Sequence, residues 1–291
     1  MTAVLDCRSL ADGYFTWVRQ ARAELPFTPG LATVLLKGRS DAGSVQYRDM
    51  ILKDARALGV VARSVEARDE AELLAAVENL NADHSVQGIV VMYPLRVHRP
   101  DDEIMDLVSA RKDIEGLNSV NLGYLIKYRR WLDEGRRLKC VVPATAKAVV
   151  KALMSVPGVR LEGAFCTLVN NSMRVGKPLG LMLENLGATV VKCYDKTPAD
   201  ALEACVRRSD VVVTAVPDPA FRLDPGWVKP GAAVVDVSFG GNVDAAALMG
   251  RAGVLTAPDN RIGRLTRAMM FVNLIYCCAA AAAPEAAWRA P

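Results

Sequence analysis

Histidine is scarce in this chain, and the paired motifs that bind metals are missing. Only His84 and His98 are present, and neither an HExxH motif nor a cysteine–histidine cluster occurs. This argues against a catalytic metal. The seven cysteines are odd in number and include no CxxC pair. Since Cys166 and Cys193 lie in apolar strand patterns, we expect buried free thiols in a reducing compartment, and therefore a cytoplasmic protein.

Aromatic residues and blocks of one charge are also scarce. Aromatics make up 6%, and the net charge of +4 is spread along the chain without a Lys/Arg block. This composition argues against a nucleic-acid partner and suits an anionic small molecule. The N-terminus lacks the basic and apolar regions of a secretory signal. The longest apolar stretch, residues 268–284, contains Asn273 and is short for a membrane span, so we expect a packed helix and no membrane partner.

The 291 residues, 52% of them hydrophobic, suffice for two domains. Apolar runs at 31–37, 60–65 and 88–92 predict strands, and helical spacing predicts helices at 44–58, 69–81 and 101–110. This alternation favours a parallel α/β domain. Residues 111–143 look irregular and polar. A second series follows, with a helix at 145–154, strands at 165–169, 189–193, 211–216, 232–237 and 254–257, and a last helix at 265–282.

We therefore predict an α/β fold in which two α/β domains flank a cleft. The first domain covers residues 1–143, with the C-terminal helix 265–283 packing back onto it. The second domain, residues 144–264, is predicted to be a Rossmann-type dinucleotide-binding domain.

Residues 164–195 carry the dinucleotide prediction. A buried strand is followed by the polar turn 170–178, a short helix, and a strand that ends at Asp195. The turn is expected to present free N–H groups at a helix N-terminus to a pyrophosphate. Asp195, about 20 residues beyond the turn, can accept both ribose hydroxyls and repel a 2′-phosphate, which favours NAD over NADP. The glycine fingerprint is absent, and an ordinary strand–helix–strand unit without a ligand remains the alternative.

In parallel α/β sheets, ligands bind beyond the carboxyl ends of the strands. That edge provides the candidate cofactor-binding residues of the second domain. They are Asn170, Asn171, Ser172, Arg174, Val175, Tyr194, Asp195, Val216, Pro217 and Ser238.

Four segments in this order and spacing resemble one family. They are Ser-Val-Gln-Tyr at 44–47, Gly-Ile-Val-Val-Met-Tyr-Pro at 88–94, Lys-Asp-Ile-Glu-Gly-Leu-Asn at 112–118, and Val-Gly-Lys-Pro-Leu at 175–179. From about residue 25 to 275 the chain is similar to methylenetetrahydrofolate dehydrogenases, including the bifunctional dehydrogenase/cyclohydrolases. The resemblance implies a folate-binding catalytic first domain, a folate substrate and a homodimer.

Differences from the bifunctional members indicate which branch of this family the chain resembles. Ile51 stands where those members have a lysine, and Met92 where they have a glutamine. Three other features resemble an NAD-specific branch whose members are dehydrogenases only. They are Glu115 within Glu-Gly-Leu-Asn, Asn170 in place of the first glycine of the turn, and Asp195. Ala144, Ala146 and Asn171 depart even from that branch.

The chemistry agrees with this branch. Hydride transfer from the methylene carbon requires alignment and exclusion of water, but no general base. Hydrolysis requires a proton carrier, which Ile51 and Met92 do not supply. We expect NAD-dependent oxidation of methylenetetrahydrofolate without cyclohydrolase activity. The resemblance implies Tyr47 and Lys53 as candidate catalytic residues, although Lys53 also reads as a solvated helix charge. The implied substrate-binding residues are Tyr47, Met92, Tyr93, Pro94, Glu115 and Asn118.

Two alternatives stay open. Asn171, Ala144, Ala146 and the segment 259–261 are compatible with a redox-inactive folate-binding or methylene-transferring relative. Another two-domain Rossmann dehydrogenase would require a catalytic lysine or aspartate in the cleft, and none lies at a comparable motif.

Overall fold

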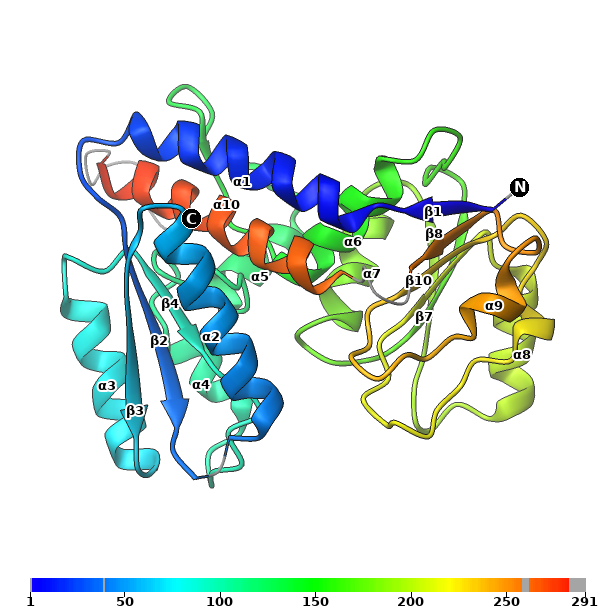
Figure 1. Cartoon of the computed structure of the whole chain (residues 1–291), viewed down its shortest axis with the longest axis horizontal. Helices are drawn as coiled ribbons and strands as arrows, with labels where there is room; N and C mark the ends of the chain where they lie inside the picture. Colours follow the sequence, from blue (N-terminus) through cyan, green and yellow to red (C-terminus); the bar gives the residue numbers. More distant parts are fainter. Residues whose placement is uncertain (1, 39, 258–261, 283–291) are drawn as a thin grey trace. The chain divides into compact units, whose positions relative to one another are not determined.

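The computed structural model describes residues 2–38, 40–257 and 262–282. The chain divides into two compact units, each with its own sheet. Unit 1 comprises Met1–Asp12 and Thr145–Thr266, and unit 2 comprises Gly13–Ala144 and Arg267–Pro291. Two α/β units were predicted, and this prediction is confirmed (Figure 1).

The centre of unit 2 is a parallel three-stranded sheet with the order β3-β2-β4. It consists of β2 (Gly30–Leu36), β3 (Val61–Ala67) and β4 (Gly88–Val91). Every residue of β2 and β4 is buried, as expected for strands covered on both faces. One face packs against α3 (Glu70–Ala82) and α4 (Asp101–Leu107) through an apolar cluster that includes Val34, Ile89 and Leu73.

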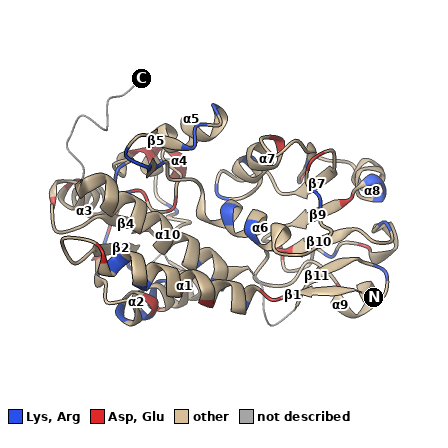
Figure 2. Ribbon diagram, turned by 90° about the horizontal axis from the view of Figure 1, so that it is seen from above, with Lys and Arg blue, Asp and Glu red and all other residues tan. Residues whose placement is uncertain are grey.

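The opposite face of this sheet carries α2 (Ala42–Ala57) and the last helix, α10 (Gly263–Ala282). A Cβ atom on Gly88 would lie 2.8 Å from Leu274 Cδ1, so glycine allows α10 to approach β4 closely. Helix α1 (Cys7–Ala23) lies beside α10, with the Phe15 and Phe271 rings 6.2 Å apart (Figures 1 and 2). By length and composition α10 could cross a membrane, but 78% of its most apolar window is buried in the protein, as in a core helix.

The stretch 111–143 is more regular than predicted. It contains α5 (Ser119–Ile126) and a small antiparallel pair, β5 (Trp131–Asp133) and β6 (Leu138–Lys139). These elements are too short to show periodicity. The N-cap residue Asn118 defines where α5 begins, because its side-chain oxygen accepts a hydrogen bond from Val120 N.

Unit 1 contains a fully parallel six-stranded sheet with the order β1-β11-β10-β9-β7-β8. Its strands are β1 (Ala3–Leu5), β7 (Phe165–Val169), β8 (Thr189–Cys193), β9 (Val211–Thr214), β10 (Ala233–Asp236) and β11 (Val254–Thr256). The remaining elements are α6 (Ala144–Met154), α7 (Gly176–Glu184), α8 (Ala199–Arg208), the 3-10 turn η1 (Pro225–Trp227) and α9 (Ala245–Leu248). The chain runs outward from β7 in both directions, so β7 and β9 border the point where the strand order reverses.

The first residues belong to a different unit from the one predicted. The sequence analysis assigned residues 1–143 to the first domain, whereas residues 1–12 are part of unit 1. The reason is that β1 is an edge strand of the unit 1 sheet. Ala3 lies opposite Val254, and Ala3 N donates to Gly253 O over 2.8 Å. The helix predicted to return to the first domain does so from Arg267 onward.

Candidate active site

The turn after β7 lies where the strand order of unit 1 reverses, which is where open α/β sheets bind ligands. Asn170 organises this turn. Its side-chain nitrogen donates to Ala215 O over 2.7 Å, and its side-chain oxygen accepts from Ser172 N, Ser172 Oγ and Gly176 N over 2.8–2.9 Å. A Cβ atom at Gly176 would lie 2.1 Å from Asn170 O, so the tight turn requires glycine there.

The prediction that this turn presents free N–H groups is wrong for the start of α7. Val175 N donates to Ser172 Oγ over 3.1 Å, Gly176 N donates to Asn170, and Lys177 N donates to Ser172 O over 3.0 Å. The side chains of Asn170 and Ser172 and the carbonyl of Ser172 therefore occupy N–H groups that were expected to face a phosphate. A pyrophosphate contact from the side chains of this turn stays a prediction. Ser172 and Lys177 are exposed, and Arg174 is half-buried.

The loops after β9 and β10 are joined by Asn242 and Asp236, neither of which is among the ten candidate cofactor-binding residues. Asn242 accepts from Val216 N over 2.8 Å and donates to Val216 O over 3.1 Å. Asp236 accepts from Asn242 N over 2.7 Å and from the N–H and hydroxyl of Ser238 over 2.9 and 2.6 Å. The signal for Asp236 was its position at the end of β10, and Asn242 lies in the loop that follows. Pro217 follows this network and is exposed.

Asp195 is placed as predicted, in the turn that follows β8. Val169 pairs with Cys193, so the segments after β7 and β8 leave the same edge of the sheet side by side. The Asp195 side chain is 74% exposed and lies 3.1 Å from Lys196 Nζ. Tyr194 is exposed, and its N–H donates to Thr197 Oγ1 over 3.0 Å. This carboxylate is accessible to a ligand at the edge, with one lysine beside it.

In unit 2 the start of α2 is tied to the end of β4. Asp41 caps α2, and the hydrogen bond from the N–H of Ser44 holds the pKa of the Asp41 carboxyl below its usual value. Ser44 Oγ donates to Tyr93 O over 3.3 Å. Met92 and Tyr93 are buried, and the Tyr93–Pro94 peptide is cis, with Pro94 exposed. The first and second segments of the resemblance therefore meet at the carboxyl edge of the sheet.

Tyr47 lies one turn into α2 and contacts α10. Its hydroxyl is 3.6 Å from Met270 Sδ, and the guanidinium carbon of Arg267 lies 6.0 Å from its ring centroid. Arg267 Nε donates to Asp54 Oδ2 over 2.6 Å. Ile51, between Tyr47 and Asp54 on the helix, is 1% exposed. Neither Arg267 nor Asp54 was predicted from the sequence, although a single arginine at the start of an apolar helical run was a signal.

The structure does not bring Lys53 to Tyr47. Lys53 is exposed and lines a shallow hollow with Val45, Gln46 and Asp49, on another face of α2. The position corresponds to a solvated helix charge, the alternative considered for this lysine.

The loop that carries Glu115 is built around a buried carboxylate. Asp113 accepts hydrogen bonds from Gly116 N, Asn118 N and Asn121 Nδ2 over 2.8–3.0 Å, and burial raises its pKa. Gly116 has φ +77°, and a Cβ atom there would lie 2.5 Å from the Val142 carbonyl carbon. Glu115, whose carbonyl accepts from Ala144 N over 3.0 Å, is half-buried on a rigid loop.

The other polar residues of this loop serve the scaffold. Asn118 caps α5 with its oxygen and donates its amide to Asp106 O and Val108 O over 3.2 and 3.0 Å. Lys112 donates to Leu80 O and Asp83 O at the end of α3. These hydrogen bonds engage both ends of the Asn118 amide, and a pterin contact from this side chain stays a prediction.

Two other groups of residues bear on the alternatives. Ala144 and Ala146 are buried at the start of α6. The segment 259–261 lies outside the described residues.

Among the residues that the structure describes, no three His, Cys, Asp or Glu side chains gather as metal ligands. Figure 2 shows Lys and Arg interspersed with Asp and Glu along the described ribbon.

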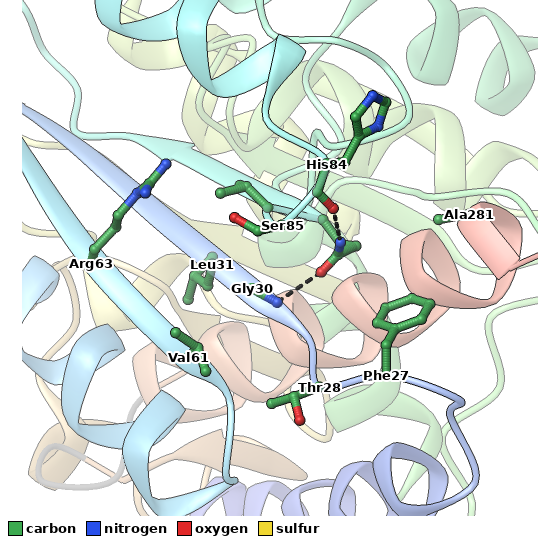
Figure 3. A pocket seen from close by; sticks show the side chains of 11 residues that line it. Phe27, Thr28, Gly30, Leu31, Val61, Arg63, His84, Ser85 and Ala281 are labelled. Carbon is green, nitrogen blue, oxygen red and sulfur yellow. Dashed lines mark hydrogen bonds between the residues drawn. The ribbon is translucent and has the colours of Figure 1, made fainter.

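A cavity of about 560 Å³ in unit 2 opens at the amino ends of the strands (Figure 3). Its wall includes Phe27, Arg63 and His84, and Gln87 bridges Gly30 N and His84 O over 2.8 and 2.7 Å. This is the edge opposite to Tyr93, and ligands of parallel sheets bind at the carboxyl edge. We therefore place the candidate site at the carboxyl edge.

Comparison with known families identifies both halves of the chain. Residues 5–115 match the catalytic domain of tetrahydrofolate dehydrogenase/cyclohydrolase, and residues 143–282 match its NAD(P)-binding domain. The chain belongs to the tetrahydrofolate dehydrogenase/cyclohydrolase family. A nicotinamide dinucleotide site in unit 1 and a folate substrate follow from this membership.

Family members of known sequence cover nearly the whole chain. Bifunctional protein FolD of Bordetella petrii is 34% identical over 266 residues, which is 88% of this chain and 86% of that protein. Its counterpart in Rhodospirillum rubrum is also 34% identical, over 90% and 91%.

Two solved structures of the tetrahydrofolate dehydrogenase/cyclohydrolase family are similar over almost their full length. The bifunctional enzyme FolD of Campylobacter jejuni has a TM-score of 0.84 at 27% identity, with 96% of this chain and 99% of that chain covered. The NAD-dependent 5,10-methylenetetrahydrofolate dehydrogenase of Saccharomyces cerevisiae has a TM-score of 0.84 at 26% identity, with 95% and 96% covered.

Proposed function

We propose that this protein oxidises 5,10-methylenetetrahydrofolate to 5,10-methenyltetrahydrofolate with NAD, by direct hydride transfer and without cyclohydrolase activity. The observation that carries this proposal is the burial of two apolar side chains, one in α2 and one directly after β4. Ile51 and Met92 are 1% and 4% exposed. Neither can hold or move a proton, and hydrolysis of the methenyl carbon depends on proton transfer.

Hydride transfer makes a smaller demand on the protein. When bound, NAD accepts the hydride, and the methenyl product is stabilised by its own two nitrogens. The protein must hold the folate in place and exclude water. Tyr47 supplies an apolar wall with a polar tip, and the rigid loop around Asp113 presents Glu115. A carboxylate can accept paired hydrogen bonds from the amino and ring N–H groups of a pterin.

The residues of unit 1 fit a dinucleotide without a phosphate on its ribose. The exposed carboxylate of Asp195 can accept two hydroxyl hydrogen bonds and would repel a 2′-phosphate. Ser172, Arg174 and Lys177 lie in the turn and at the start of α7, and the two cationic side chains carry the charge opposite to that of a pyrophosphate.

One observation favours NADP as a second candidate. Lys196 Nζ lies 3.1 Å from the Asp195 carboxylate and could contact a 2′-phosphate. The related methylenetetrahydrofolate dehydrogenase-cyclohydrolase of Trypanosoma brucei is described in complex with NADP. Both Asp195 and Lys196 are exposed, and the ion pair between exposed side chains is weak. Asp195 follows β8 at the spacing typical of the acid that binds the ribose hydroxyls, so we favour NAD.

Steady-state assays of the whole chain test the proposal. Reduction of the nicotinamide is followed with methylenetetrahydrofolate and NAD, then with NADP. We expect turnover with NAD and a much lower kcat/KM with NADP. Methenyltetrahydrofolate is then offered alone, and its absorbance should decay at the rate seen in buffer. Enzyme-dependent decay would show a bifunctional enzyme, and equal use of both dinucleotides would remove the role given to Asp195.

We also propose that the protein is a cytoplasmic homodimer. The dimer follows from the family resemblance. The cytoplasmic location is supported by seven free cysteines, six of them buried. Gel filtration with light scattering tests the assembly.

A further inference from the structure

The contact between α2 and α10 contains a buried ion pair with no part in the hydride transfer described above. Arg267 Nε and Asp54 Oδ2 are 2.6 Å apart, and the two side chains are 9% and 15% exposed. Most other ion pairs in the described chain are far more exposed, as Arg160–Glu162 shows at 79% and 76%. Burying two charges costs desolvation free energy, so such a pair is weak evidence for a gain in stability.

The pair lies against Tyr47. The Arg267 guanidinium carbon is 6.0 Å from the ring centroid, within the range of a cation–π contact. Met270, one turn further along α10, places its sulfur 3.6 Å from the Tyr47 hydroxyl. Asp54 lies seven residues after Tyr47, on the same face of α2. One residue of α10 thus contacts the ring, another contacts the hydroxyl, and Asp54 holds the first in place.

We propose that Arg267 is a positioning residue that fixes the ring of Tyr47 in the orientation that serves hydride transfer, with Asp54 as its anchor. The inference rests on the proposed function, in which Tyr47 lines the folate site. A guanidinium is suited to this task because it is planar, stays charged at all accessible pH values, and can stack on a ring while it donates to a carboxylate.

The test compares Arg267→Met with the wild type in full-length protein. We expect kcat to fall about tenfold, KM for methylenetetrahydrofolate to rise severalfold, and KM for NAD to stay unchanged. The deuterium isotope effect measured with substrate deuterated at the methylene carbon should increase, because a misplaced ring slows the hydride step itself. Asp54→Asn should shift the same quantities in the same direction, by less.

Arg48→Met is a matched control. Arg48 follows Tyr47 directly, is 13% exposed, and pairs with Asp49 and Glu66 over 2.8 and 3.1 Å. Its replacement removes an equally buried, paired arginine from α2 without touching the Tyr47 ring contacts described here. It should lower stability and leave kcat, both KM values and the isotope effect unchanged.

A double-mutant cycle separates positioning from direct contact with the folate. If Arg267 acts through Tyr47, Arg267→Met should have little further effect on kcat in a Tyr47→Ala background, because the effects of coupled residues do not add. An undiminished effect in that background would overturn the inference, and so would an Arg267→Met variant that matches the wild type. If Arg267→Met does not fold, the same double-mutant cycle with Tyr47→Ala is measured for Asp54→Asn and for Arg267→Lys. Absence of dehydrogenase activity in the wild type would instead refute the proposed function.

Discussion

The side chain of Asn170 joins the ends of β7 and β9, since its nitrogen lies 2.7 Å from the carbonyl oxygen of Ala215. The same side chain accepts hydrogen bonds from Ser172 and Gly176 at the start of α7. We expect Asn170→Ala to leave these groups without partners and to cost about 1–3 kcal/mol of unfolding free energy. The KM for the dinucleotide should rise while the folate affinity stays the same.

Urea unfolding and steady-state kinetics measure both effects. Asn171→Ala is the control, because Asn171 is the next residue and is exposed. It should change stability by less than about 0.5 kcal/mol, as surface substitutions usually do. If the two variants behave alike, Asn170 does not organise the turn.

Asp195 is expected to determine the choice of dinucleotide. Asp195→Ser removes the charge that opposes a 2′-phosphate and leaves Lys196 without its partner at 3.1 Å. The ratio of kcat/KM for NAD to that for NADP should fall about tenfold or more, equivalent to about 1.4 kcal/mol. In the double variant Asp195→Ser/Lys196→Ala, much of the gained NADP activity should disappear. A ratio that does not move in Asp195→Ser would place the ribose elsewhere.

Glu115 is expected to hold the pterin. Glu115→Gln retains the size of the side chain but replaces one acceptor oxygen by a donor. We expect a loss of about 1.5–3 kcal/mol of folate binding, the scale of a hydrogen bond to a charged group. Calorimetric titration of NAD should give the wild-type affinity. Unchanged folate affinity would make Glu115 a surface acid on a rigid loop.

The cap of α2 predicts a pH-dependent stability. The hydrogen bond from the N–H of Ser44 lowers the pKa of the Asp41 carboxyl, so the ionised form is favoured in the folded state. Its stabilisation is complete above the pKa of an unfolded aspartate, about 4, and is lost as the pH falls through the lower folded value. Asp41→Ala should cost about 1 kcal/mol at neutral pH and progressively less in acid.

Urea unfolding of the wild type and the variant across this pH range provides the measurement. Asp41→Asn is the matched control, because asparagine caps a helix without a charge. Asp41→Asn should lose little stability at neutral pH. The contribution of its uncharged cap to the free energy of unfolding should stay constant over the acid range. A cost of Asp41→Ala that is the same at all pH values would contradict a charged cap.

The sequence predicted those parts of the fold that depend on local patterns. Strands β7 and β8 have the predicted bounds, because each is a run of β-favouring residues between turn residues. The three-residue strand β1 could not be predicted, since it is defined only by pairing with β11, about 250 residues away. The eight residues of α5 are likewise too few for a periodic signal.

In the candidate site, too, only the features that depend on local sequence patterns could be predicted. The positions of Asp195 and Asn170 after β8 and β7 were predictable from the strand patterns, and their roles in binding stay predictions. The contact between Arg267 and Asp54 could not be predicted, because the two residues lie 213 positions apart in the sequence. The occupied N–H groups of α7 were not foreseen either, because they depend on the side-chain directions of Asn170 and Ser172.

The buried helix α10 gives the protein an order of maturation during its synthesis. Every segment of unit 1 up to Thr266 leaves the ribosome before the part of α10 that completes unit 2. Met269, Phe271 and Leu274 are buried, Leu274 lies against Gly88 of β4, and Asn273 donates to Ile114 O and Val142 O over 2.9 Å. Domains fold as units while the chain grows. Unit 1 can therefore fold while the nascent unit 2 still lacks the part of α10 that belongs to it, because residues 267–282 are translated after Thr266.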